Sequence, residues 1–284
     1  MRQYEKTVEK VAATLVRAGS TFRHDKMKAY CQAIEKEKNN QAKWVMEQIV
    51  ENANVAKREK SPLCDDTGIP HLFLEVGPNQ AITGDLLNGI REGVMTGLML
   101  LPGRPMAIKG NDKQRIDQSR GLSDNPADVL PAPIIIKPID EEVIRLHILM
   151  QGGGPAIRGK SYRVFHKHNV NVVMEKIIEW AEEAVAQLGC SPSTLAIGIG
   201  RSHYEAAALM LEAQVYGCYD IQSEMEQMIT DRVNKTRIGA LGLTGDTSVL
   251  GTFLKVGPQR ASGVRIVCLR PCCCFEPRIA SVEL

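Results

Sequence analysis

The sequence contains no apolar run that approaches the roughly 18 residues of a membrane-spanning helix, so we expect no membrane span. It also has no excess charge of one sign, because 35 Lys and Arg side chains are balanced by 33 Asp and Glu side chains, for a net charge of +2. We therefore expect no basic face of the kind that binds nucleic acid. The segment Met1–Lys6 is charged and has no apolar stretch, which predicts a cytoplasmic protein without a secretory signal.

Eight cysteines stand out in a composition that is otherwise ordinary, with 44% hydrophobic and 24% charged residues. The cytoplasm keeps thiols reduced, so metal binding or thiol chemistry explains these cysteines better than disulfides do. The short C-x2-C pairs of a zinc ribbon are missing. The cysteines stand at positions 31, 64, 190, 218, 268, 272, 273 and 274.

The cysteines fall into two groups by their place in the predicted structure. Those on helices, at a helix end or on a strand are expected to be small packed residues, and they are Cys31, Cys218 and Cys268. Cys64, Cys190 and the run 272–274 follow element boundaries beside proline or glycine, where loops bring ligands together. Three thiolates from such loops would suit an iron–sulfur cluster with one iron open to substrate, whereas four would close it.

Predicted helices and strands interleave without a strict alternation, which indicates an α+β, or irregular mixed α/β, fold. Apolar residues recur at helical spacing through residues 1–60, so we expect a helical N-terminal segment there and a mixed region over residues 61–284. Residues 103–132 are predicted to form a long irregular loop. Further helices are predicted at 84–101, 170–188, 202–216 and 220–234, and strands at 72–76, 134–136, 143–148, 195–200, 249–256 and 263–269.

The segment Gly154–Ser161 matches the phosphate-binding pattern G-x-x-x-x-G-K-[ST] letter for letter. That motif needs a helix that begins at its Lys-Ser, whereas the following residues 162–165 are typical of a strand. A nucleotide-binding protein is therefore the least favoured hypothesis. Exposed backbone N–H groups of the glycines, with Arg158 and Lys160 nearby, would suit an anion, either a carboxylate or a phosphate. The alternative is a tight glycine turn with solvated basic neighbours.

Five short motifs follow one another in order between about residue 60 and residue 275. They are Cys64-Asp65-Asp66-Thr67-Gly68; Arg104 in the next loop; Gly152-Gly153-Gly154 with Gly159-Lys160-Ser161; Gly189-Cys190-Ser191-Pro192 with Gly198-Ile199-Gly200; and the glycine-rich segment 234–250. In this order the motifs resemble those of the class I, iron–sulfur fumarases and tartrate dehydratases, in which the first motif reads C-Q-D-T-G.

The resemblance implies a [4Fe-4S] cluster held by Cys64, Cys190 and one cysteine of the last run, for which Cys272 is the best match and Cys273 the next. It implies proton-transfer or hydrogen-bonding roles for Asp66 and Thr67 beside the cluster. The substrate-binding residues that it implies are Asp65, Arg104, Gly152, Gly153, Gly154 and Lys160. The reaction would add or remove water on a small dicarboxylate, with fumarate and malate as the family default and L-tartrate or another hydroxy-dicarboxylate as the alternative.

The other substrate-binding residues of that family lie in a second region, which is a separate β chain in its two-subunit members. The resemblance therefore implies an α subunit that acts in a hetero-oligomer with a β-type subunit. Two departures motivate a different class of function. Asp65 stands where the family has glutamine, and Arg104-Pro105-Met106 stands where it has R-H-N. A cluster- or anion-binding regulatory protein without turnover is the hypothesis that these departures favour.

Overall fold

The computed structural model describes residues 3–284, and the chain divides into two compact units. Unit 1 comprises Met1–Phe22, Ala53–Gly152 and Arg278–Leu284, and unit 2 comprises Arg23–Asn52 and Gly153–Pro277. The boundaries of these units differ from those of the predicted segments 1–60 and 61–284. Of the three N-terminal helices, α1 (Gln3–Ser20) belongs to unit 1, α2 (His24–Lys36) belongs to unit 2, and α3 (Asn40–Glu59) runs from unit 2 into unit 1.

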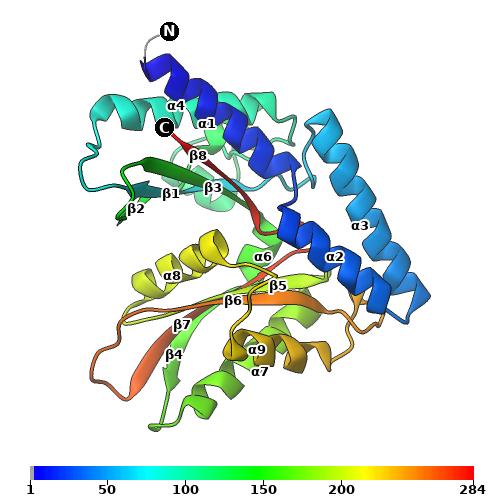
Figure 1. The fold of residues 1–284 in the computed structure, drawn as a ribbon. Coiled ribbons are helices and arrows are strands. Elements are labelled where there is room, and N and C mark those ends of the chain that lie inside the picture. Colours follow the sequence, from blue (N-terminus) through cyan, green and yellow to red (C-terminus); the bar gives the residue numbers. More distant parts are fainter. Residues whose placement is uncertain (1–2) are drawn as a thin grey trace. The chain divides into compact units, whose positions relative to one another are not determined.

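Unit 1 is built on a four-stranded mixed sheet in the order β2-β1-β3-β8. Its strands are β1 (Ile69–Val76), β2 (Ile135–Pro138), β3 (Ile144–Gln151) and β8 (Arg278–Glu283). β1 and β2 are parallel, whereas β3 is antiparallel to both β1 and β8. Helices α1 and α4 (Gly84–Leu100) cover one face of this sheet (Figure 1). Alternate apolar strand residues point into this core, as period-2 patterning requires.

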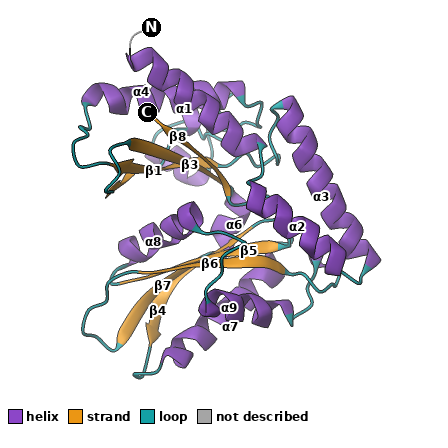
Figure 2. Ribbon diagram, viewed as in Figure 1, coloured by secondary structure: helices purple, strands orange, loops and turns teal. Residues whose placement is uncertain are grey.

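Unit 2 is built on a second mixed sheet in the order β4-β7-β5-β6. Its strands are β4 (Lys160–Phe165), β5 (Ser193–Gly200), β6 (Val249–Val256) and β7 (Val264–Cys272). Helix α8 (His203–Tyr216) packs on one face, and α7 (Val170–Leu188) and α9 (Glu224–Asn234) pack on the other (Figure 2). All residues of β5 are buried, as expected for a central strand covered on both faces.

The two mixed sheets with their separate helices confirm the α+β fold class. The predicted helix at 170–188 and the predicted strand at 249–256 have the observed bounds. The helix predicted from about residue 220 begins only at Glu224, because Ser223 caps it and accepts a hydrogen bond from the Glu226 N–H. The 103–132 loop contains only the short helices α5 (Asp112–Asp117) and η1 (Pro126–Val129). Over residues 3–284, no helix is long and apolar enough to cross a bilayer.

One expectation about the cysteines was wrong. Cys31 is exposed on α2 rather than packed, because the buried face of that helix carries Lys26 and Tyr30 instead. Cys218 is half-buried, and Cys268 is buried on β7 as strand alternation predicts.

Helices α1 and α4 approach each other closely because α4 presents glycines at four-residue spacing. A Cβ atom on Gly93 would lie 2.6 Å from the Val11 Cβ and 2.8 Å from the Val8 carbonyl oxygen. A Cβ on Gly97 would lie 2.8 Å from the Leu15 Cβ. The interior glycines that weaken the helix by propensity are therefore required by packing.

We expect Gly93→Ala to lower the free energy of unfolding by about 1–2 kcal/mol, because the clash with α1 outweighs the gain in helix propensity. Gly84→Ala is the matched control, since a Cβ on Gly84 at the start of the same helix would meet nothing within 4 Å. Chemical denaturation measures both values. Equal stabilities for the two variants would contradict the packing explanation.

Candidate cluster and substrate site

Unit 1 contributes the loop that carries the first motif, directly before β1. The Arg104 Nε lies 3.5 Å from the Asp65 Oδ2, and both side chains are exposed. Thr67 is buried, and its hydroxyl donates to the Met106 sulfur at 3.7 Å. Only glycine fits at position 103, because a Cβ there would lie 2.3 Å from the Thr67 Cγ2. The structure thus brings together the predicted residues Asp65, Thr67 and Arg104.

Arg278, at the start of β8, holds this loop against the end of β3. Its Nη1 donates to the Asp66 carbonyl oxygen at 2.6 Å, and its Nε donates to the Met150 carbonyl oxygen at 3.1 Å. Gly68 has a positive φ of 86°, and a Cβ there would lie 2.7 Å from the Arg278 Nη2. The sequence analysis did not single out Arg278. The one feature of the sequence that could have indicated a role is its position shortly after the last cysteines. The side chain is 2% exposed, so its hydrogen bonds are buried.

Unit 2 brings Cys190 next to the cysteine run 272–274, although the two segments are distant in the sequence. Cys190 follows the end of α7 at Gly189, and its carbonyl oxygen accepts from the Cys274 N–H at 2.8 Å. Burial raises the pKa of the Cys190 thiol, the charge of Cys273 raises it further, and Arg158 lowers it. A hydrogen bond with Cys273, and then burial, raise the pKa of the Cys274 thiol well above its usual value. All eight cysteines of the chain carry thiols rather than disulfides.

Cys272 lies in a different environment from Cys273, although it is the neighbouring residue. Its side chain is fully buried, and its Sγ donates to the Gln214 Oε1 on α8 at 3.6 Å. It packs in an apolar cluster with residues of β5 and α8, and burial raises its pKa strongly. This contact to α8 follows from strand alternation at the end of β7, which turns Cys272 toward that helix.

The turn that carries the cysteine run is braced by buried polar groups. The Arg270 guanidinium binds both carboxylate oxygens of Glu276, at 3.0 and 3.1 Å. From α2, the Lys26 ammonium donates to the Glu276 carbonyl oxygen, and the Tyr30 hydroxyl donates to the Cys274 carbonyl oxygen at 2.7 Å. Burial lowers the pKa of Lys26 to about 8. Sequence reasoning missed both α2 residues; a lysine and a tyrosine four residues apart, on the buried face of a helix, were the available signal.

The glycine motif contributes a short helix rather than a phosphate-binding loop. Helix α6 (Gly153–Arg158) ends before Lys160, which begins β4, so the helix that a P-loop needs after its Lys-Ser is replaced by a strand. The Arg158 guanidinium donates to the carbonyl oxygens of Gly154 and Gln187. The Lys160 ammonium lies 3.7 Å from a carboxylate oxygen of Glu183 and 4.9 Å from the centre of the Trp180 ring. Both basic side chains are therefore engaged within unit 2.

The predicted cysteine ligands are divided between the units, with Cys64 in unit 1 and Cys190 and the run 272–274 in unit 2. Across the described residues 3–284, no three His, Cys, Asp or Glu side chains are grouped so that they could hold a metal ion. The donors within unit 2 are all thiols, with Cys273 next to both Cys190 and Cys274. Soft thiolate donors fit an iron–sulfur cluster, which cysteines ligate.

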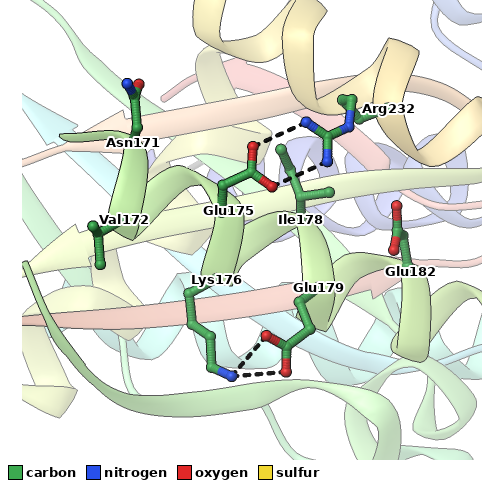
Figure 3. A pocket seen from close by; sticks show the side chains of 8 residues that line it. All are labelled: Asn171, Val172, Glu175, Lys176, Ile178, Glu179, Glu182 and Arg232. Atoms are coloured by element: carbon green, nitrogen blue, oxygen red, sulfur yellow. Dashed lines mark hydrogen bonds and ion pairs between the residues drawn. The ribbon is translucent and has the colours of Figure 1, made fainter. Parts of the chain in front are cut away.

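A surface hollow of about 500 Å³ lies over α7 and α9, away from the motifs (Figure 3). Four of its five charged side chains form two pairs: Arg232 binds both oxygens of Glu175 at 2.9 and 3.0 Å, and Lys176 binds Glu179 at 2.7 Å. None of the predicted site residues lines this hollow. We therefore assign it no part in the candidate site.

Comparison with known proteins agrees with this set of motifs. The chain is 25% identical over 286 residues to a Methanocaldococcus jannaschii protein whose name gives L(+)-tartrate dehydratase subunit alpha as a provisional assignment, and the match covers 96% of each chain. It is 24% identical over 256 residues to the L(+)-tartrate dehydratase subunit alpha of Escherichia coli and to that of Shigella boydii, which covers 87% of this chain and 80% of each relative. The family model for fumarate hydratase (Fumerase) matches residues 8–283. The chain therefore belongs to the fumarate hydratase (Fumerase) family of hydro-lyases.

Proposed function

We propose that this chain is the α-type subunit of an iron–sulfur hydro-lyase that adds or removes water on a small dicarboxylate. The observation that carries the proposal is that Cys190 and Cys273 lie close together in unit 2. Both cysteines lie within the part of the chain that the family model matches. The relatives' names support a partner of β type, because each of them is a subunit alpha. The active form would then be a hetero-oligomer, and the cytoplasm would be its compartment.

The cluster would be held by Cys64, by Cys190 and by one cysteine of the run 272–274. Within that run we favour Cys273 over Cys272, because Cys273 lies close enough to Cys190 to raise the pKa of its thiol, whereas the Cys272 thiol donates to Gln214. When bound, such a cluster supplies a Lewis-acidic iron that polarises the substrate's hydroxyl and carboxylate groups.

The loop residues of unit 1 would bind the substrate and move its proton. Arg104 is exposed and would take one substrate carboxylate through charge-assisted hydrogen bonds, with the glycines 152–154 as a second anion contact. The Asp66 carboxylate would accept or return the proton, while its carbonyl is held by Arg278. Thr67 would orient this loop, since its hydroxyl binds Met106 and its methyl group packs on Gly103.

Two chemistries remain open for the substrate, and the relatives' names favour one. The family description names fumarate, whereas the relatives are named for L(+)-tartrate. Both are dicarboxylates, so both would use Arg104 and the glycine segment in the same way.

The assay uses the full chain, purified without oxygen together with its co-encoded β-type partner. We expect that L-tartrate, malate or fumarate is converted by the pair and not by the chain alone. The C=C bond of fumarate is followed by ultraviolet absorbance, and the 2-oxo acid that forms from L-tartrate when its enol product tautomerises is measured by a reaction of its carbonyl group. If the pair binds iron but converts none of the three, the chain is a regulatory protein and the hydro-lyase proposal fails.

We expect Cys64→Ala, Cys190→Ala and Cys273→Ala each to abolish retention of iron and sulfide after anaerobic reconstitution, because each removes one of three thiolate ligands. Cys272→Ala is the matched control one residue away and is expected to retain the cluster. Iron and sulfide analysis per chain measures this. Loss in Cys272→Ala with retention in Cys273→Ala would contradict this choice and make Cys272, the best match by the resemblance, the third ligand.

We expect Asp65→Gln to lower KM for the dicarboxylate about two- to fivefold. The Asp65 carboxylate competes with the substrate carboxylate for Arg104, and an exposed ion pair of this kind contributes little free energy. The variant restores the family's glutamine and removes a negative charge beside an anionic substrate. Asp112→Asn is the control, because it removes an equal exposed charge that pairs with Arg115. A rise in KM would show that Asp65 itself binds the substrate, and would contradict the competition between Asp65 and substrate.

A further inference from the structure

The outer edge of β4 differs from the other sheet edges of the chain. β4 lies at one edge of the sheet β4-β7-β5-β6, and β6 lies at the other (Figure 1). In the sheet of unit 1, the edge strands are β2 and β8. An edge strand presents backbone N–H and C=O groups to which another strand can pair, unless the edge is covered or interrupted. The four edges can therefore be compared by what covers them.

Three of the four edges are covered or interrupted by the chain itself. At β8, the Arg17 guanidinium of α1 donates to the Ser281 carbonyl oxygen at 2.5 Å. At β6, the Glu226 carboxylate of α9 accepts a hydrogen bond from the Leu254 N–H at 2.7 Å. β2 has only four residues and ends in a proline, which cannot donate to a neighbouring strand. These devices prevent a further strand from pairing at β8, β6 and β2.

The edge of β4 has no such cover. The His166 N–H donates to the Gly263 carbonyl oxygen at 3.1 Å, which continues the antiparallel ladder with β7. Because bonded pairs alternate along such a ladder, the backbone groups of Ser161, Arg163 and Phe165 point away from β7. Within the described residues 3–284, no hydrogen bond reaches these outward backbone groups. The edge of β4 is thus open to a further strand.

The sequence of β4 is complementary to itself around Tyr162, whose side chain is 51% exposed. In a two-fold pair of antiparallel strands, facing side chains lie on the same face of the sheet, so the rotation axis passes through one residue position. An axis at Arg163 would place two guanidinium groups opposite each other, which is destabilising. An axis at Tyr162 instead places two phenol rings opposite each other and pairs Ser161 with Arg163 of the second copy. Those two residues have outward backbone groups, so each such pair exchanges two hydrogen bonds.

We propose that two copies of this chain pair antiparallel through their β4 strands, around a two-fold axis at Tyr162, so that the sheets of the two unit 2 regions form one continuous sheet. The aromatic pair at the axis adds to the backbone hydrogen bonds on both sides of it. The inference goes beyond the proposed function and does not rest on it, because the pairing needs neither a cluster nor a substrate. The β-type partner would then bind a dimer of this chain.

The test introduces charge at position 162, because that residue faces itself across the axis. Tyr162→Glu places two carboxylates opposite each other and Tyr162→Lys places two ammonium groups there, so we expect each variant to raise the Kd of the dimer about tenfold. An equimolar mixture of the two variants pairs unlike charges and is expected to restore the dimer. Analytical ultracentrifugation of the full chain, alone and with its β-type partner, measures the association.

Ile221→Glu is the control, since it adds the same charge at a 78% exposed position next to Gln222, whose side chain binds the N–H of Thr252 on β6. Chemical denaturation checks that each variant is folded. A monomeric unmodified chain, variants that dimerise as well as the unmodified chain, or a mixture that stays monomeric would overturn the inference. So would a chain that is monomeric alone and loses its β-type partner in Tyr162→Glu, because the edge would then bind a strand of that partner.

Discussion

The buried ion pair between Arg270 and Glu276 is the interaction on which the cysteine end of unit 2 depends. Arg270 lies on β7 two residues before the run and Glu276 lies in the turn two residues after it, so the pair brackets the three cysteines. Both side chains are almost fully buried. Removal of one partner would leave an uncompensated buried charge, which typically costs about 3–5 kcal/mol. The turn is thus held by a buried ion pair in addition to the apolar packing of Cys272.

Each unit holds one loop with polar groups in place, and the interactions that hold the loop differ between the units. In unit 1, Arg278 binds the backbone carbonyl groups of Asp66 in the first motif and of Met150 on β3, and the chain packs closely at Gly68 and Gly103. In unit 2, the strand end, the α7 cap at Gly189 and the helix α2 hold the cysteine turn. Catalytic groups need this precision, because small displacements of reacting groups reduce rates steeply.

Much of this structure follows from sequence patterns, and the exceptions have physical reasons. Periodicity located α7 because its buried apolar residues recur at helical spacing along the whole helix. It could not divide the chain into the observed units, since α1 and β8, at opposite ends of the sequence, pack together in unit 1. The cysteine motifs were visible in the sequence, but the choice between Cys272 and Cys273 depends on the surroundings of each thiol where β7 ends. Lys26 and Arg278 were missed because their hydrogen bonds are buried, and the sequence does not show which charged side chains are buried.

The central claim is that three thiolates of this chain hold a cluster with one iron open to a dicarboxylate. Mössbauer spectroscopy of the anaerobically reconstituted chain with its β-type partner tests it most directly. The account predicts about four irons per chain, one of which differs from the other three and changes its signal when L-tartrate or malate is added. Four equivalent irons that do not respond to substrate, or a chain that takes up no iron at all, would contradict it.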